Sequence, residues 1–353
     1  MSINLKRPIK LSRASAWRTY IGGKLIGQLH GDENAVDTNF PEDWIMSTVT
    51  ARNSGREHIV EGISIIEGTD ISLKDLIAKN TVECLGKAHT EKFGATPGVL
   101  VKLLDSAERL TIQVHPTREK AKALFGSDFG KTECWYIVSG REINGERPCI
   151  YFGFKEGITR EKWKDIFERQ NISEMLSCLH KFEVNPGDTF LIEGGIPHAI
   201  GAGCFLVEIQ EPTDYTVRTE KVTPSGREVA DFMCHQGLGF DKMFDCFDYT
   251  GYTMEETAKR WKIQRCGDTL IDSRSTEMFS LYEINIDGER EFSPDGVFGG
   301  IYVLDGEGII DGIEVKKGCQ FFISASCEPF TVKGRMKLIK YHGPYALMRK
   351  EQL

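Results

Sequence analysis

The stretch LTIQVH, residues 110–115, places an amide and an imidazole two residues apart within an alternating run of polar and apolar side chains. In an extended strand, residues i and i+2 lie on the same face. Gln113 and His115 therefore share one face, and the aliphatic residues of the stretch point to the other. Imidazole nitrogen and amide or carboxylate oxygen suit zinc and other divalent transition ions. The stretch predicts half of a metal site on one strand.

Two further side chains that could bind a metal follow along the chain. Glu133 opens the strand-like run ECWYIVSG, and His198 follows a Gly-Gly-Ile-Pro turn in PGDTFLIEGGIPHAIGAG. A lone histidine beside a proline is usually structural. Two histidines, a glutamine and a glutamate on neighbouring strands favour a metal centre instead. We predict that one ion binds to Gln113, His115, Glu133 and His198.

A basic segment, TREKAKALFGSDFGK, separates the first histidine from the glutamate. Its spacing predicts a helix over 117–125, capped by the opening threonine. Gly126 and Gly130 could act as hinges, so we expect a lid or an edge that contacts a phosphate group. The alternative is an exposed amphipathic helix on which Lys120 and Lys122 are only solvated.

The composition is that of a soluble globular protein with an acidic excess. The chain has 353 residues, of which 40% are hydrophobic and 27% charged, and its net charge is −8. This balance argues against a nucleic-acid or anionic-membrane binder, because either needs a concentrated basic face. A phosphorylated small molecule could still bind in a locally basic pocket. The ten cysteines occur singly, with no CxxC pair, which indicates free thiols in a reducing compartment.

The amino-terminal sequence MSINLKRPIKLSRASAW lacks the long apolar core of a secretory signal. No uninterrupted apolar run of 18 residues occurs along the chain. We therefore expect a cytoplasmic protein without a membrane span, and we consider organelle targeting the weaker alternative.

Many short alternating runs, with 36 glycines against 12 prolines, indicate a mainly β scaffold with tight turns. The Asn144-Gly145 pair is a two-residue hairpin signal. A helical insertion is expected over about 156–182, with the clearest helical spacing over 159–182. Strands are predicted over 99–104, 110–115, 134–139, 149–154, 189–194 and 205–210.

From about residue 279 a second series of alternating runs begins, and it keeps the turn glycines without placing a histidine at a metal position. Before it, the helical pattern TMEETAKRW belongs to a connector. We therefore expect a metal-binding catalytic domain over 1–245. The remainder, 246–353, is expected to hold the connector and a second, ligand-free domain.

The E-x6-G pattern that starts at Glu133 and the Gly-Asp-x-x-x-Ile…Pro-His stretch resemble the two metal-binding motifs of the cupin superfamily. QVHP, then GKTE, then PHAIGAG…VEIQEPTDYTVR resembles the zinc-dependent mannose-6-phosphate isomerases of the cupin type, over most of residues 95–225. The resemblance implies a bicupin, that is, two jelly-roll β-barrels with helical insertions, and one Zn²⁺ per chain. It also implies a role in carbohydrate metabolism, interconverting mannose 6-phosphate and fructose 6-phosphate. We expect a monomer or a homodimer.

Carried onto this sequence, the zinc ligands of the family fall on Gln113, His115, Glu133 and His198. Its active-site lysine, two residues before the glutamate, falls on Lys131, and its later acidic and arginine positions fall on Glu208, Asp214 and Arg218. Arg218 suits the negative charge of an enediolate because it cannot deprotonate. Lys131 is expected to contact the phosphate or the sugar hydroxyls. Glu208 is the first candidate for proton transfer, and Asp214 the second.

Three departures from the family pattern concern the substrate more than the metal. Glu193 stands where the second cupin motif usually has proline, a GAG run replaces the asparagine after His198, and FPEDWIMST replaces a Gly-Glu-Ser-Trp-like run. Two alternatives therefore stay open: an isomerase or epimerase of another sugar phosphate, and a metal-dependent sugar-phosphate-binding protein without turnover. An oxygen-dependent cupin is disfavoured, because Gln113 takes the place of a third histidine.

Overall fold

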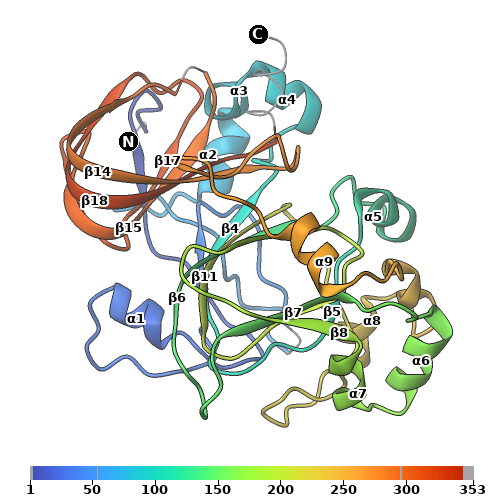
Figure 1. Ribbon diagram of the computed structural model, residues 1–353. Coiled ribbons are helices and arrows are strands. Elements are labelled where there is room, and N and C mark those ends of the chain that lie inside the picture. The colour runs from blue at the N-terminus through green and yellow to red at the C-terminus, as the bar shows by residue number, and fades with distance from the viewer. Residues whose placement is uncertain (1–2, 54, 295, 345–353) are drawn as a thin grey trace.

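The computed structural model describes residues 3–53, 55–294 and 296–344, and in these ranges strands hold more residues than helices (Figure 1). The strands form three sheets, so the mainly β prediction is confirmed. None of the helices in the described ranges has both the length and the apolar character needed to span a membrane.

A six-stranded antiparallel sheet carries the glutamates of the predicted site. Its central strand is buried along its whole length, since it pairs on both sides and is covered on both faces. In spatial order the strands are β2 (Ser15–Ala16), β3 (Glu42–Ile45), β4 (Leu100–Asp105), β11 (Cys204–Gln210), β6 (Glu133–Gly140) and β9 (Thr189–Ile192).

A five-stranded antiparallel sheet carries the glutamine and one of the two histidines. In its ladder, Gln113 lies opposite His198 on one side and opposite Arg218 on the other. Apolar side chains of both sheets, such as Trp135 and Phe152, share one core cluster, so the two sheets pack face to face. The strands in order are β12 (Val217–Arg218), β5 (Gln113–Val114), β10 (His198–Ile200), β7 (Cys149–Phe154) and β8 (Leu179–Glu183).

Helices cover the other face of this five-stranded sheet. Trp163 and Phe167 belong to the same buried cluster as Val114 of β5 and Ile112 just before it. The single helical insertion predicted over 159–182 is two helices, because Gln170 adopts φ 48° and Asn171 caps the second one. The prediction is wrong for 179–182, which belong to strand β8. The covering elements are α6 (Arg160–Glu168), α7 (Ile172–Ser177) and the 3₁₀ helix η1 (Lys242–Cys246), and α8 (Asp231–His235) contacts β12.

The C-terminal strands form a seven-stranded sheet with its own apolar cluster (Figure 1, orange and red). The N-terminal strand β1 joins it by pairing with β17, so the first residues of the chain complete the last sheet. The division at 245/246 stays a prediction. The strands in order are β1 (Ile9–Leu11), β17 (Gln320–Ile323), β15 (Gly299–Ile310), β18 (Phe330–His342), β14 (Ser280–Phe292) and β13 (Thr269–Ile271), and β16 (Ile313–Lys316) pairs with β15.

The helix predicted over 117–125 is α5, and the Thr117 side chain accepts a hydrogen bond from the Lys120 amide, as expected of a cap. The TMEETAKRW pattern is α9, with a capping box between Thr253 and Glu256. The helices not yet introduced are α1 (Lys24–Leu29), α2 (Leu73–Lys79), α3 (Thr81–Leu85), α4 (Lys87–Phe93), α5 (Arg118–Phe125) and α9 (Met254–Trp261).

Most predicted strands are confirmed within one or two residues, and 149–154 matches at both ends. The strand predicted over 110–115 is too long, since only Gln113–Val114 forms a ladder. The amide of Ile112 donates instead to the Glu220 side chain, 2.6 Å away. The alternation still holds for Gln113 and Val114, but Leu110 joins the core between the sheets rather than the outer cluster.

The Asn144-Gly145 pair forms a turn with φ of 53° and 80°, both positive as a type I′ turn requires. Ile143 and Glu146 on either side exchange both backbone hydrogen bonds, 3.0 Å each, in an antiparallel bridge, so the two-residue hairpin is confirmed. It does not extend into the flanking strands, because β6 and β7 lie in different sheets.

Two glycines hold the backbone that follows His115. A Cβ on Gly130 would lie 2.6 Å from the Pro116 carbonyl oxygen, and one on Gly194 would lie 2.7 Å from the Thr117 Cα. Both approaches are closer than real Cβ contacts allow. Gly130 therefore allows close backbone packing and is not the predicted hinge. Together, the two glycines let the chain pack tightly against the segment after His115.

We predict that Gly130→Ala and Gly194→Ala each destabilise the protein by about 1–3 kcal/mol, because each added methyl overpacks the same backbone segment. Thermal unfolding followed by circular dichroism measures the loss. The double variant should lose less than the sum, since both methyls displace one segment. Wild-type melting temperatures for both single variants would contradict this packing.

Candidate metal centre and active site

Three of the predicted ligands, His115, Glu133 and His198, form a buried cluster whose ligand atoms all lie within 4.8 Å of one another. The two Nε2 atoms are 3.2 Å apart. Glu133 Oε1 lies 3.1 Å from Nε2 of His115, and Oε2 lies 3.9 Å from Nε2 of His198. The histidines come from or directly follow the five-stranded sheet and the glutamate from the six-stranded sheet, so the cluster spans the space between them. No second such cluster occurs among the described residues.

The outer nitrogen of each imidazole is held by a backbone carbonyl. Nδ1 of His115 lies 2.8 Å from the Tyr215 oxygen, and Nδ1 of His198 lies 2.8 Å from the Ile196 oxygen. These contacts assign the ring proton to Nδ1, so both Nε2 lone pairs face the cluster. Burial, and then the charge of Lys131, lower the pKa of His115. Burial and the neighbouring imidazole lower the pKa of His198 to about 3. Both rings are therefore neutral, as metal ligands must be.

The geometry of the donors fits a divalent ion. Ligand atoms about 2.0 Å from a tetrahedral zinc ion lie about 3.3 Å from one another, close to most distances in this cluster. Two imidazole lone pairs and a carboxylate face each other in a buried space. Glu133 Oε1 accepts no hydrogen bond among the described residues, and its nearest cation is Lys131 Nζ at 3.0 Å. The donor set thus has the chemistry of a cation site.

The amide of Gln113 lies beside the cluster, with Nε2 3.3 Å from His198 Nε2. Amide nitrogen and oxygen differ only by a rotation about the last bond. Turned over, the amide would present its oxygen as a fourth donor at the same spacing. The structure therefore brings all four predicted ligands together.

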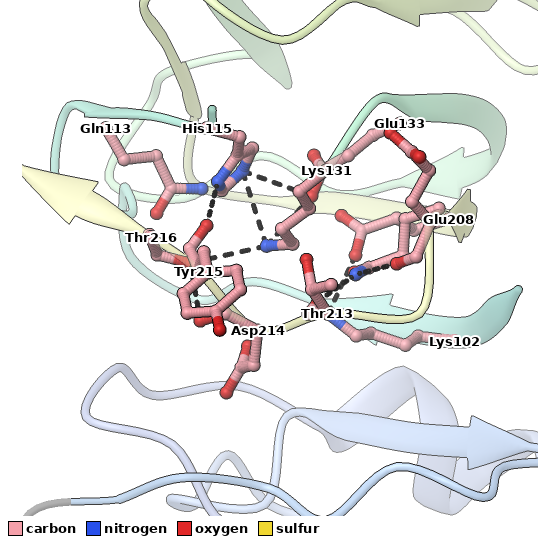
Figure 2. A network of polar contacts seen from close by, with 12 residues as sticks. Lys102, Gln113, His115, Lys131, Glu133, Glu208, Thr213, Asp214, Tyr215 and Thr216 are labelled. Atoms are coloured by element: carbon pink, nitrogen blue, oxygen red, sulfur yellow. Dashed lines mark hydrogen bonds and ion pairs between the residues drawn. The ribbon is translucent and has the colours of Figure 1, made fainter. Parts of the chain in front are cut away.

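The Lys131 side chain lies between His115 and Glu133 (Figure 2). Its ammonium lies 3.3 Å from His115 Nε2 and 3.3 Å from the Thr216 hydroxyl. Because it is buried and faces both the cluster and the cleft, it can donate to an oxygen of a bound molecule.

The other three predicted residues line a cleft of about 670 Å³ that opens beside the cluster. Lys102 donates to Glu208 at 2.9 Å (Figure 2). Arg18 holds Asp214 at 3.3 Å. Arg218 donates to the Thr216 and Met233 carbonyls and forms no ion pair with a carboxylate in the described part of the chain. Its guanidinium charge is left for a ligand.

The cleft is locally basic in an acidic protein. Of the described residues that line it, six are arginine or lysine and four are glutamate or aspartate. A locally basic pocket of this kind is what we expected for the binding of a phosphorylated ligand by an acidic protein.

The two carboxylates proposed for proton transfer differ in their electrostatics. Burial, and then the charge of Glu133, raise the pKa of Glu208, although Lys102 opposes them. Burial would also raise the pKa of Asp214, but Arg18, Lys131 and Lys102 outweigh it and hold that pKa below its usual range. Asp214 is thus a fixed anion, whereas Glu208 is the group better suited to gain and lose a proton.

The segment between the first histidine and the glutamate does not line the cleft, apart from Lys131 at its end. Lys120 donates to the Phe247 carbonyl, and the exposed Lys122 pairs with Asp128. The lid hypothesis is therefore unsupported for α5, and the alternative of an exposed helix fits better. The rim is formed instead by loops that contain Arg52 and Pro224.

Sequence reasoning missed five of the charged residues that line the cleft: Arg18, Glu42, Arg52, Lys102 and Arg109. Of these, Arg18, Glu42 and Lys102 are buried. Lys102 could have been found from the sequence, because it is a lone charge inside the apolar run VLVKLL. A lysine in such a buried strand is almost always paired with an acidic group. Glu42 and Arg18 lie in loop-like sequence, which gives no such signal.

We predict that His115→Ala lowers zinc affinity at least about 100-fold, since loss of a partner outside the ligand set alone costs about 10–100-fold. Competition with a chelating dye measures the affinity. His180→Ala serves as control, because His180 is also buried but bonds the Tyr252 carbonyl, outside the cluster. Equal zinc affinity of the His115 variant and the wild type would contradict the ligand assignment.

Two family models match the chain: the phosphomannose isomerase type I catalytic domain over residues 42–132, and the mannose-6-phosphate isomerase cupin domain over 272–343. The crystal structure of the mannose 6-phosphate isomerase from Bacillus subtilis superposes with a TM-score of 0.71 at 24% identity, over 95% of this chain and 99% of that chain. At this identity the likeness concerns the fold alone.

Relatives at higher sequence identity include two proteins of Bacillus subtilis. YvyI, whose name assigns it provisionally as a mannose-6-phosphate isomerase, is 30% identical over 272 residues, which cover 73% of this chain and 80% of that protein. The mannose-6-phosphate isomerase ManA is 29% identical over 271 residues, covering 74% of this chain and 81% of ManA. This chain belongs to the mannose-6-phosphate isomerase family.

Proposed function

We propose that this protein is an aldose–ketose isomerase that interconverts mannose 6-phosphate and fructose 6-phosphate. The observation that carries the proposal is a candidate metal cluster of two histidines and a glutamate at one side of a basic cleft. Family membership supports the same reaction.

We assign the metal ligands to Gln113, His115, Glu133 and His198, and the metal to one Zn²⁺ per chain. A bound zinc ion would supply a Lewis acid for the sugar oxygens, worth several kcal/mol of charge stabilisation. Neutral imidazole and carboxylate donors at tetrahedral spacing favour zinc over magnesium or calcium, which prefer oxygen ligands.

Isomerisation moves one hydrogen between neighbouring carbons of the open-chain sugar. Glu208 takes the proton from C2 of the aldose, and a double bond forms between C1 and C2 as electrons move to the C1 oxygen. The same carboxyl group then returns its proton to C1, while the hydroxyl proton on O2 is transferred to O1. Lys102 and the Trp135 indole both donate hydrogen bonds to Glu208, and they hold its carboxylate in one orientation on the cleft wall.

The enediolate that forms between the two proton transfers carries negative charge. Arg218 lines the cleft without a carboxylate partner and stays charged at any pH of interest, so we assign it to this charge. Lys131, beside the cluster, donates to a sugar oxygen. Asp214, fixed by Arg18, orients sugar hydroxyls rather than moving protons.

Three further expectations accompany this function. We propose that the two facing sheets and the C-terminal sheet are two cupin barrels, and that the first contains the reaction site. We keep the cytoplasm as the location, because the ten cysteines are unpaired. We also expect a monomer or a homodimer.

We predict that purified protein isomerises mannose 6-phosphate, loses activity on dialysis against a chelator and regains it with Zn²⁺. A coupled assay for fructose 6-phosphate measures turnover. Activity confined to another sugar phosphate would replace the substrate in the proposal. Tight binding of mannose 6-phosphate without turnover would favour the binding-protein alternative.

We predict that Arg218→Ala lowers kcat by about 100-fold or more while the zinc content stays unchanged, because the cation acts on charge that develops during the reaction. Steady-state kinetics and metal analysis of the same preparation give both values. Arg147→Ala serves as control, since that side chain is 61% exposed and pairs only with Glu183 among the described residues. An unchanged kcat for Arg218→Ala would contradict the role.

A further inference from the structure

Charges of alternating sign form a continuous network along one wall of the cleft. Arg18 lies 3.3 Å from Asp214 and 2.9 Å from Glu42. Lys102 lies 4.0 Å from Glu42 and 2.9 Å from Glu208. The network therefore ends at the two carboxylates of the proposed reaction site, and Glu42 is its central member.

Both carboxylate oxygens of Glu42 are engaged by side chains of the protein. Oε1 accepts from the Tyr20 hydroxyl at 2.7 Å, and Oε2 accepts from the Trp44 indole at 2.7 Å and from Arg18. Only 3% of the residue is exposed. Its influence on a bound molecule must pass through the two cations that it holds.

Strand register explains why this network is rigid. Trp44 on β3 lies opposite Lys102 on β4, which lies opposite Glu208 on β11, which lies opposite Trp135 on β6. Residues paired in this way project from the same face of a sheet. Glu42, Lys102 and Glu208 are therefore placed by backbone pairing on three neighbouring strands. Arg18 and Asp214 lie outside the strands and join the network through their ion pairs.

Buried charges of this kind are stable only as a set. Removing one partner of a buried pair leaves an uncompensated charge, which the structure relieves by moving side chains or admitting water. Loss of Glu42 would leave Arg18 and Lys102 facing each other without the anion between them.

We propose that Glu42 is a positioning residue for the isomerisation: it anchors Arg18 and Lys102, and through them it fixes Asp214 and Glu208 on the cleft wall. The inference rests on the proposed function, because it concerns the residues assigned to that reaction. It adds a residue outside the metal cluster whose two oxygens both accept hydrogen bonds from the protein.

The chain offers a matched control elsewhere in the fold. Glu283 on β14 is also 3% exposed and accepts a hydrogen bond from a tyrosine, Tyr136. It pairs with Arg265 at 2.7 Å and Lys337 at 3.4 Å. It does not line the cleft, so its loss costs stability without reaching the reaction site.

The test compares Glu42→Gln with Glu283→Gln in the zinc-loaded protein. Both changes remove a buried charge and keep the side-chain size. We expect kcat for mannose 6-phosphate to fall about 10–100-fold in Glu42→Gln, with KM within about threefold and zinc content unchanged. In Glu283→Gln we expect a lower melting temperature and a kcat within about twofold of wild type. A kcat within twofold of wild type for Glu42→Gln, or equal losses in both variants, would overturn the inference.

A second variant covers the case in which Glu42→Gln fails to fold. Glu42→Asp keeps the charge but is one methylene shorter, so we expect a smaller loss of kcat, though still more than about threefold. Wild-type kcat in this variant would count against a positioning role.

A crystal structure of Glu42→Gln tests the inference without turnover. We expect the contact between Arg18 and Asp214, the contact between Lys102 and Glu208, or both, to be broken. Preservation of both contacts would overturn the network. If the wild type itself failed to isomerise mannose 6-phosphate, the proposed function would fall, and this structural comparison would still decide the role of Glu42.

Discussion

The site depends on the burial of charge between two packed sheets. A carboxylate or ammonium group removed from water must find a partner of opposite charge or a metal ion, because its desolvation is otherwise too costly. In this protein the interior side of β3, β4, β11 and β6 carries several such groups, and each of them contacts another. Mutual compensation holds them in place, and the same groups face the cleft.

This arrangement links stability and chemistry in one set of side chains. The candidate metal cluster draws donors from both sheets, so it forms only when the sheets pack face to face. An ion bound there would tie the sheets together as well as polarise a ligand. The outer nitrogens of the imidazoles are bound by backbone carbonyls, which leaves the inner nitrogens as ready donors. We infer that the cleft is preorganised before any sugar phosphate enters.

Local patterns predicted more of this structure than composition did. The i, i+2 spacing placed Gln113 and His115 on one face of a strand, and the structure has them on the side of the cluster. A helix cap at Thr117 was predicted from residue type and is confirmed. The strand at 110–115 was predicted too long, because the Ile112 amide donates to the distant Glu220. The hairpin at Asn144-Gly145 is confirmed, but the sheets that β6 and β7 join were decided by distant strands.

The sequence by itself determined the family, the mainly β character and the side chains that could bind a metal, because these follow from residue type and short spacing. Only the tertiary structure decided that Arg18 and Glu42 join the cleft wall, that Gly130 is packed rather than hinged, and that α5 stays away from the cleft. The physical reason is that these outcomes depend on contacts between segments far apart along the chain. Strand register brings Lys102 beside Glu208 across 106 residues of sequence, and no local pattern specifies that pairing.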